Sequence, residues 1–389
     1  MAGARTTTYR GNRPTCAALA LAIAALVASL AAASTLAAQD PSVERILALD
    51  PRWTVSFDTA PAAPAGYDQD TGYVPLKGGD LLAVDLNQGI VRWRVALATA
   101  STPATGDGLV FAAGEGVITA LDQRTGQTQW RTPLPGPLAS PLAWEAGWLF
   151  ASLESGELLA VHGQDGRIVW RATLDSPMAV VPVTSAERLY GALRDGRIVA
   201  LELNTGAVTW ALTLGEQVTG MMALNDQLLV GTRANKLHSI AMSRGSVRWS
   251  QKAGADVTGA PVADEDRIYF AAFDNIVRAL DRRSGNLRWL RRLPSRPSGG
   301  PLRIQDVVLV PLVTTDIDAF SASTGAPAFT IRAVGELGGL PFLRETARPT
   351  ATRLIAMSRE GALQGFAVRF EPPPVRLAEL PGVAVKGGH

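Results

Sequence analysis

A short segment that recurs seven times restricts this chain to a repeat architecture. Each copy has a glycine followed four residues later by an aromatic residue, and successive aromatics are 37 to 40 residues apart. The copies span residues 83–93, 120–130, 160–170, 200–210, 239–249, 279–289 and 319–329. Their aromatic residues are Trp93, Trp130, Trp170, Trp210, Trp249, Trp289 and Phe329, and their glycines are Gly89, Gly126, Gly166, Gly206, Gly245, Gly285 and Gly325. A fixed period of this length is typical of propellers and solenoids.

Each repeat also predicts a β-hairpin upstream of its glycine. In residues 147–162, for example, an apolar run is followed by a Ser-Gly turn and then by a second run of alternating character. The polar turn that ends in the repeat glycine joins this hairpin to a third strand, because glycine adopts the positive φ that a tight turn requires. A further short strand, often beginning near a proline, precedes the hairpin. Each repeat therefore predicts four short strands.

Four strands in about 40 residues predict one blade of an all-β propeller. A single blade cannot bury both of its faces, so blades must stack side by side around an axis. The recurrent tryptophan is expected to lie between neighbouring blades, where its ring buries a large apolar area. Replacing a fully buried copy with alanine should cost about 3–5 kcal/mol.

The number of hairpins predicts eight blades. The first hairpin spans residues 72–85 and the last spans 352–368, but the last copy lacks the strand that carries Gly and Trp. Conversely, Trp53 lies 40 residues before Trp93 and has no hairpin ahead of it. We therefore expect the N-terminal strand around Trp53 to complete the eighth blade and close the ring. A seven-bladed ring with additional strands outside it is the alternative.

The two ends of the chain differ from the repeats. Residues 1–38 predict a secretory signal peptide, because Arg5, Arg10 and Arg13 precede an Ala/Leu-rich run that ends in small residues. An uncleaved membrane anchor is the alternative, although an alanine-rich run is only weakly hydrophobic. Residues 39–371 predict the propeller, and residues 372–389 predict a Pro/Gly-rich tail. We expect a periplasmic or secreted protein, either free or peripheral at the outer membrane.

Removal of residues 1–38 changes both cysteine content and charge. The single cysteine, Cys16, lies within this segment and is not preceded by a lipoprotein box. Three arginines leave with the signal, so Lys+Arg falls from 37 to 34 against 35 acidic residues, and the net charge changes from +2 to −1. A nearly neutral chain without cysteine excludes disulfides and thiolate metal sites, and it gives no electrostatic reason to expect nucleic acid as a partner.

The segments of the type ALDxxTGxxxW, as in 120–130, resemble the quinoprotein or PQQ-like propeller repeat over about residues 50–370. One branch of that family contains PQQ-dependent dehydrogenases. The resemblance to this branch implies PQQ on the propeller axis, a Ca²⁺ site and a carboxylate base. Another branch contains non-enzymatic eight-bladed propellers of the BamB type. The resemblance to these implies a scaffold that binds a protein of the outer-membrane barrel-assembly machinery through loops on one rim.

The residues of the mature chain argue against catalysis. Its repeats are nearly uniform, which leaves little chain to build a substrate pocket. His162 and His238 are expected to be local variations at a turn and within a strand. Asp85, Asp122 and Asp281 recur at one position of the repeat, which favours a turn-capping role. We therefore expect no enzyme, no cofactor and no catalytic or metal-binding residue. A PQQ-dependent dehydrogenase of alcohols or sugars remains the alternative.

Protein binding is the function that the sequence favours. The resemblance aligns an acidic interface loop of the BamB type with residues 254–262 and places Asp256 on one acidic position, while Thr258 replaces the second acid. The partner loop aligns with residues 215–222, where the expected arginine is absent. Asp256 is thus a candidate partner-binding residue, with a solvated turn acid as the alternative. A carbohydrate-binding propeller of the envelope is a further alternative, for which Trp144 and Trp148 are the candidate exposed aromatics.

Overall fold

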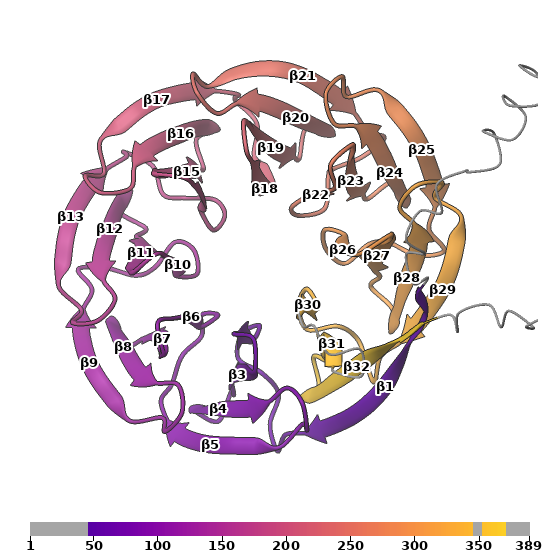
Figure 1. The fold of residues 1–389 in the computed structure, drawn as a ribbon. Helices are drawn as coiled ribbons and strands as arrows, with labels where there is room; N and C mark the ends of the chain where they lie inside the picture. Colours follow the sequence, from indigo (N-terminus) through magenta and orange to yellow (C-terminus); the bar gives the residue numbers. More distant parts are fainter. Residues whose placement is uncertain (1–45, 345–351, 371–389) are drawn as a thin grey trace, which may run out of the picture. The chain divides into compact units, whose positions relative to one another are not determined.

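The computed structural model describes residues 46–344 and 352–370, which belong to one compact unit. Eight four-stranded antiparallel sheets follow one another around a ring (Figure 1), so the predicted eight-bladed β-propeller is confirmed. The described residues contain no helix that could cross a membrane. The predicted signal peptide, 1–38, and the predicted tail, 372–389, lie outside the described residues and remain predictions.

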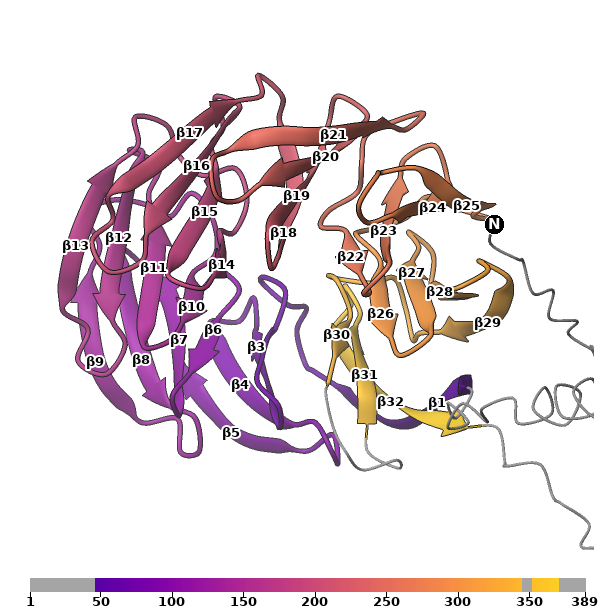
Figure 2. The ribbon, with the colours of Figure 1, turned by 45° about the horizontal axis from the view of Figure 1, so that its top comes forward.

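Seven blades are continuous in sequence, and their strands run in order from the inner to the outer edge of the ring (Figure 2). Blades 1 to 3 comprise β2 (Gly66–Tyr67), β3 (Thr71–Pro75), β4 (Asp80–Asp85), β5 (Val91–Ala96); β6 (Ala104–Gly106), β7 (Leu109–Gly114), β8 (Val117–Asp122), β9 (Thr128–Pro133); and β10 (Ala143–Glu145), β11 (Trp148–Ser152), β12 (Glu157–His162), β13 (Ile168–Thr173). Blades 4 and 5 comprise β14 (Val183–Ser185), β15 (Arg188–Ala192), β16 (Arg197–Glu202), β17 (Val208–Thr213); and β18 (Val218–Leu224), β19 (Gln227–Thr232), β20 (Lys236–Ala241), β21 (Ser246–Lys252). Blades 6 and 7 comprise β22 (Val262–Ala263), β23 (Arg267–Ala272), β24 (Ile276–Asp281), β25 (Leu287–Arg292); and β26 (Leu302–Ile304), β27 (Val307–Pro311), β28 (Asp316–Ser321), β29 (Pro327–Arg332).

Blade 8 joins the two ends of the propeller. It consists of β30 (Phe342–Leu343), β31 (Thr352–Met357), β32 (Ala362–Phe370) and, outermost, β1 (Ile46–Ser56). Strand β1 pairs antiparallel with β32 from Ile46 opposite Phe370 to Ser56 opposite Ala362. The N-terminal strand that lacked a hairpin therefore completes the hairpin that lacked an outer strand, as predicted from the sequence, and the ring has eight blades rather than seven.

The hydrophobic core is divided among the blade interfaces. Eight clusters of buried side chains are present in the described residues, and each contains residues of two adjacent blades. The indole of Trp170 lies at one such interface, where it is buried and donates a hydrogen bond to the Leu203 carbonyl of the next blade at 2.9 Å. Trp289 is also buried, whereas the other repeat tryptophans are half-buried. The strands thus depend on neighbouring blades for burial.

The repeat glycines have a second structural role besides the turn. Gly206 has a φ of +71°, and a Cβ built on it would lie 2.5 Å from Cε3 of Trp170 in the preceding blade. All seven repeat glycines combine a positive φ with a tryptophan of the preceding blade in this position. Gly and Trp of adjacent repeats are therefore one packing unit, which explains their recurrence as a pair.

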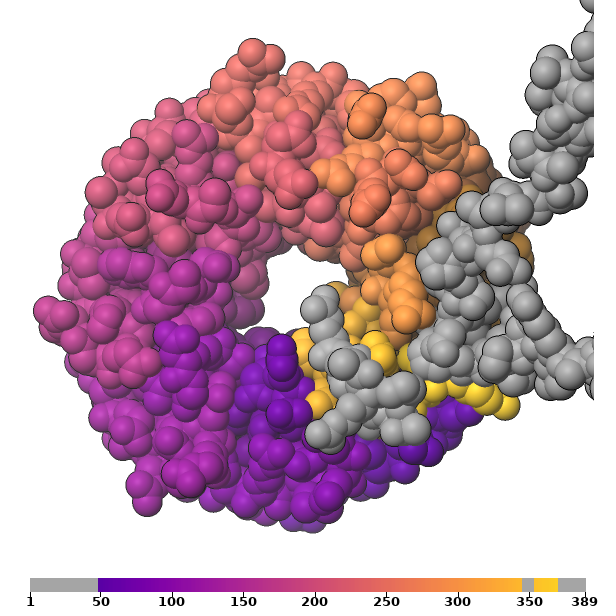
Figure 3. Space-filling model, in the orientation of Figure 1, coloured from indigo at the N-terminus to yellow at the C-terminus, as the bar shows by residue number. Residues whose placement is uncertain are grey.

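The strand order gives the ring two rims that carry different connections. The linker rim carries the connections between blades and the turns between the second and third strands of each blade. The turn rim carries the turns between first and second strands and between third and fourth strands. An opening is visible at the centre of the ring (Figure 3). Any candidate surface can therefore be assigned to one of these two rims.

Candidate interaction surface

The predicted partner-binding residue, Asp256, lies on the linker rim between β21 and β22. Its backbone carbonyl accepts a hydrogen bond from the Phe273 amide at 2.9 Å, which fixes the linker to the turn between β23 and β24. The side chain is half-buried, and its carboxylate has no hydrogen bond or ion pair within the described residues. A fixed backbone with an unpaired carboxylate is suited to a cationic or hydrogen-bond-donating partner group.

Thr258, at the position of the expected second acid, is a structural residue. It is buried, and its hydroxyl donates to the carbonyl oxygens of Ala271 at 3.1 Å and Gly299 at 3.0 Å. This hydroxyl connects the linker of blade 6 to its own second strand and to the following linker. The residue at the position of the second acid therefore serves as an internal anchor for the loop that carries Asp256.

The structure also places an arginine beside the 215–222 loop, whose own sequence lacks the expected arginine. Arg233 is exposed at the turn between β19 and β20, and its amide donates to the Gln217 carbonyl of the neighbouring linker at 2.8 Å. The residue before it, Thr232, accepts a hydrogen bond from the Val257 amide at 3.1 Å. Arg233 lies outside the 215–222 segment in sequence. The backbone hydrogen bonds of Arg233 and Thr232 bring it to the same part of the rim as Asp256.

An exposed apolar surface continues from Asp256 along blades 6 and 7. Phe273 is 45% exposed, and the Arg296 guanidinium lies 6.0 Å from the centre of its ring. Val313, which is 43% exposed, is held beside Arg296 by a backbone hydrogen bond of 2.9 Å. We call Arg233, Asp256, Phe273, Arg296 and Val313 the blade 5–7 patch. It combines aromatic and aliphatic surface with both signs of charge.

A chain of hydrogen bonds that the sequence did not indicate lies beside this patch. His238 is buried and bridges Ser250 Oγ at 2.7 Å and Glu216 Oε2 at 2.9 Å. Glu216 also accepts hydrogen bonds from Lys236 and Thr232. Burial raises the pKa of Glu216, but these donors, Lys236 first, outweigh burial and hold the pKa below its ordinary value. The group ties the linker before β18 to strands β20 and β21, so His238 is a connecting residue and not only a strand variation.

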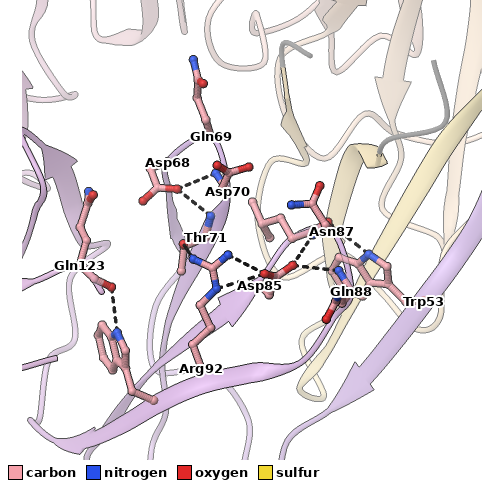
Figure 4. Close-up of polar contacts among 12 residues, drawn as sticks. Trp53, Asp68, Gln69, Asp70, Thr71, Asp85, Asn87, Gln88, Arg92 and Gln123 are labelled. Carbon is pink, nitrogen blue, oxygen red and sulfur yellow. Dashed lines mark hydrogen bonds and ion pairs between the residues drawn. The ribbon is translucent and has the colours of Figure 1, made fainter. Parts of the chain in front are cut away.

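The turn rim has a different, mostly polar character. Figure 4 shows Arg92 bonded to Asp85 and to Thr71, and Asp68 accepting the amides of Asp70 and Thr71. Asp68, Asp70, Thr71 and Arg92 line a cavity of about 600 Å³ that extends to Gly106 and Arg124 of blade 2. The Arg92 guanidinium and the Asp68 carboxylate are thus used within the turn network of blade 1.

The recurrent aspartates cap turns, as the sequence predicted. Asp281 accepts the Arg283 and Ser284 amides at 3.1 and 2.8 Å, and Asp122 accepts the Arg124 and Thr125 amides at 3.1 and 2.8 Å. Asp85 accepts the two matching amides in blade 1. The Ser284 amide, followed by Arg288, holds the pKa of Asp281 far below its usual range. The carboxylates are thus used within their own turns.

The two candidate carbohydrate-binding tryptophans are packed. Trp144 stacks on Phe111 with ring centres 5.0 Å apart and lies against Gly106 of blade 2. Trp148 is partly buried against the cluster between blades 3 and 4. The possibility that Trp144 is an exposed aromatic is therefore wrong, because Gly106 has no side chain and leaves room for the indole ring.

His162 is half-buried, and its Nδ1 forms a hydrogen bond with Asp165 Oδ1 at 3.0 Å within a turn.

Within the described ranges, no three His, Cys, Asp or Glu side chains gather in a way that could hold a metal ion. The blade 5–7 patch is therefore described by its surface chemistry alone. Its exposed Phe273 and Arg296 belong to residue types that are enriched at protein interfaces, whereas buried catalytic groups are not part of it.

Comparison with known proteins agrees with this architecture. The sequence profile of the family described as outer membrane protein assembly factor BamB matches residues 43–131, 114–224 and 194–328. No curated protein sequence matches the chain. BamB from Moraxella catarrhalis is 18% identical with a TM-score of 0.71, over 84% of this chain and 99% of that chain. Quinohemoprotein alcohol dehydrogenase from Comamonas testosteroni is 12% identical with a TM-score of 0.67, over 84% and 77%. Sqt1 from Saccharomyces cerevisiae is 11% identical with a TM-score of 0.71, over 82% and 99%. At such identities the likeness extends to the fold alone.

Proposed function

The chain belongs to the family of the outer membrane protein assembly factor BamB, and from that premise we propose that it is a non-catalytic scaffold that binds another protein during outer-membrane protein assembly. The proposal places the mature chain in the periplasm after removal of residues 1–38. The observation that carries it is the exposed Phe273 beside the unpaired carboxylate of Asp256 on the linker rim.

The chemistry of the blade 5–7 patch supports protein binding over other uses. Aromatic residues and arginine supply most of the binding energy at protein interfaces, usually surrounded by near-neutral contacts. Here Phe273 provides the apolar anchor, and Arg296 lies over its ring. Asp256 and Arg233 contribute opposite charges in neighbouring blades, which favour one orientation of the partner. The proposed partner is a periplasmic domain of the barrel-assembly machinery that presents an apolar residue flanked by at least one basic group.

Site-specific photo-crosslinking in the cell envelope tests this proposal. Phe273→p-benzoylphenylalanine should form an adduct that contains an outer-membrane assembly protein, because residue 273 would lie inside the interface. The matched control is Asn286→p-benzoylphenylalanine, which is also exposed but on the turn rim, and it should give no such adduct. Asp256→Lys should abolish the adduct at residue 273, whereas Asp266→Lys on the turn rim should not. Equal crosslinking from both rims, or adducts with no assembly protein, would contradict the proposal.

The alternative, a PQQ-linked oxidation, has its own measurement. Purified mature protein is mixed with PQQ and Ca²⁺, and its absorbance spectrum and dye-linked oxidation of alcohols and sugars are recorded. We expect neither a bound quinone band nor turnover. Stoichiometric quinone binding with turnover would overturn the non-catalytic part of the proposal and leave the protein-binding part to the crosslinking result.

A further inference from the structure

Blade 2 is shorter than the other blades, and the shortage lies on the linker rim. Trp93 and Trp130 are 37 residues apart, whereas the other repeat tryptophans follow one another at 39 or 40 residues. The linker into blade 2 contains seven residues, 97–103, and the linker into blade 3 contains nine, 134–142. Two residues separate β7 from β8, whereas four separate β11 from β12. Blade 2 therefore lacks chain at two adjacent places.

The missing chain has a defined structural counterpart in the other blades. Six linkers form a β-bridge with the last residue of the second strand of their own blade or with the residue that follows it, and the linker into blade 5 pairs directly as part of β18. The bridging linker residues are Pro61, Leu138, Met178, Val257, Pro297 and Leu337. Within the described residues, only the linker into blade 2 makes no such backbone pair. Each of the six bridges thus places an extended segment with an apolar side chain at this position.

In blade 2, the backbone groups that would pair with a bridging linker have another partner or none. The Thr99 hydroxyl donates to the Ala113 carbonyl at 2.5 Å, in place of a linker amide. In blade 3 the Glu154 amide, at the matching position, donates to the Pro137 carbonyl at 2.9 Å. The Glu115 amide of blade 2 has no protein acceptor within the described residues. A backbone donor therefore remains available at the short turn.

A hollow of about 500 Å³ occupies the space that the missing chain would fill. Its apolar walls include Leu76 of blade 1 and both Leu134 and Leu138 of the next linker. A Cβ built on Gly136 would meet no atom within 4 Å, so the hollow has room at this wall. Leu138 is half-buried, whereas its counterpart in blade 4, Met178, is fully buried. The chain that buries Met178 in blade 4 therefore has no equivalent over Leu138.

We propose that this hollow binds a short extended peptide segment of another protein. The segment inserts one apolar side chain between Leu76, Leu134 and Leu138, and one of its carbonyl groups accepts the hydrogen bond of the Glu115 amide. The occupant is inferred from the molecule itself, since an extended segment with an apolar residue covers the same place in six other blades. The volume lies within the range of ordinary ligand sites. Lys77 and Glu115 both line the hollow, which favours a segment without net charge. This site lies in blades 1–3 and does not depend on the proposed function of the blade 5–7 patch.

The chain supplies a defined probe for this site. The capped and uncharged peptide Ser-Pro-Met-Ala-Val-Val-Pro has the sequence of residues 176–182, which cover the matching position in blade 4. Added to isotope-labelled mature protein, it should cause saturable NMR shifts at the Glu115 amide and at the methyl groups of Leu134 and Leu138. The same peptide with Asp in place of its Met should cause none. A panel with Leu, Val, Phe or Pro at that position covers other apolar anchors.

Two independent variants block the site, and a third serves as control. Gly136→Trp fills the hollow, and exchange of residues 97–103 for the nine residues of 174–182 restores the internal cover. Both should weaken peptide binding by about tenfold or more. Val247→Trp, at an exposed position of β21, should leave binding unchanged. A melting temperature equal to that of the parent verifies that each variant is folded.

Three results would overturn the inference. The first is the absence of shifts with every peptide of the panel at ~5 mM, a concentration that detects even millimolar binding. The second is undiminished binding to the linker-exchanged protein, which would place the peptide elsewhere. The third is saturable binding of an octanoyl glycoside, in the absence of any peptide binding, which would identify the hollow as a site for small apolar molecules.

Discussion

At the residue scale, each repeat glycine lies beneath the tryptophan of the preceding blade. The glycine supplies a backbone conformation that other residues rarely adopt, and it also leaves the space into which the indole packs. The indole N–H then bonds to a carbonyl of that same neighbouring blade, as Trp170 does with Leu203. Trp249 is an exception, since its buried Nε1 has no hydrogen-bond partner within the described residues.

The two roles of the repeat glycine can be separated by a matched pair of substitutions. Gly206→Ala must place its Cβ against Trp170, whereas Gly108→Ala has a similar positive φ but meets no atom within 4 Å. Gly108→Ala should cost about 1–2 kcal/mol for the left-handed backbone alone. Gly206→Ala should cost a further ~1–3 kcal/mol for overpacking. Urea unfolding at 25 °C measures both, and equal losses would show that the indole contact is unimportant.

The turn-capping aspartates predict a pH-dependent contribution to stability. The pKa of Asp281 is lowered in the folded state, so its contribution is present above the unfolded value of about 4 and is lost as pH falls through the folded pKa. Asp281→Asn should therefore be less stable than the parent at pH 7, by about 0.2–1 kcal/mol for an exposed pair, and the difference should shrink toward pH 2. Asp266→Asn, which lacks these contacts, is the control in the same unfolding series. A difference that persists unchanged at low pH contradicts this account.

At the element scale, the ring depends on one pairing between segments far apart in sequence. Strand β1 is the outermost strand of blade 8, and Trp53 on this strand donates a hydrogen bond to the Leu86 carbonyl of blade 1 at 3.2 Å. Trp53 therefore makes the same contact at the closing interface that Trp170 makes within the continuous part of the chain. Without β1, strand β32 becomes an unpaired edge, and unpaired edges promote association.

Complementation in trans tests this closure. A chain that begins at residue 57 lacks β1 and should melt at a lower temperature and self-associate, which analytical ultracentrifugation detects. Addition of a synthetic peptide of residues 46–56 should restore the monomer and raise the melting temperature. The same peptide with Trp53→Ala should restore less, because it lacks the indole contact with blade 1. An unaffected truncated chain would show that β1 is dispensable.

At the scale of the whole molecule, the ring is regular in backbone but not in chemistry. The third residue of the third strand is apolar in blades 1, 3 and 4, as in Leu82 and Val199. The same position is polar or charged in the other five blades, where it is occupied by Thr119, His238, Arg278, Asp318 and Gln364. The exposed Phe273 and Val313 lie on the linker rim of blades 6 and 7. The blades thus share one backbone pattern while their side chains differ from blade to blade.

The sequence was sufficient for the fold because the repeat encodes it locally. The spacing of Gly and Trp, the hairpin turns and the unmatched strand around Trp53 predicted eight blades and their closure. The surface was less predictable, since pairing of distant strands determines which residues become neighbours. Arg233 and Phe273 join Asp256 through backbone hydrogen bonds that no local pattern reveals. The hollow of blade 2 was visible only as a 37-residue spacing, whose location required the strand bounds.

The most direct test of the scaffold proposal is hydrogen–deuterium exchange on the purified mature protein, with and without the periplasmic domain of the barrel-assembly protein. We predict slower exchange on addition of that domain in residues 253–260 and 271–275, which surround Asp256 and Phe273, and unchanged exchange in the turn-rim residues 281–286. Unchanged exchange throughout, or protection restricted to the turn rim, would contradict the proposal that the linker rim of blades 5–7 binds the partner.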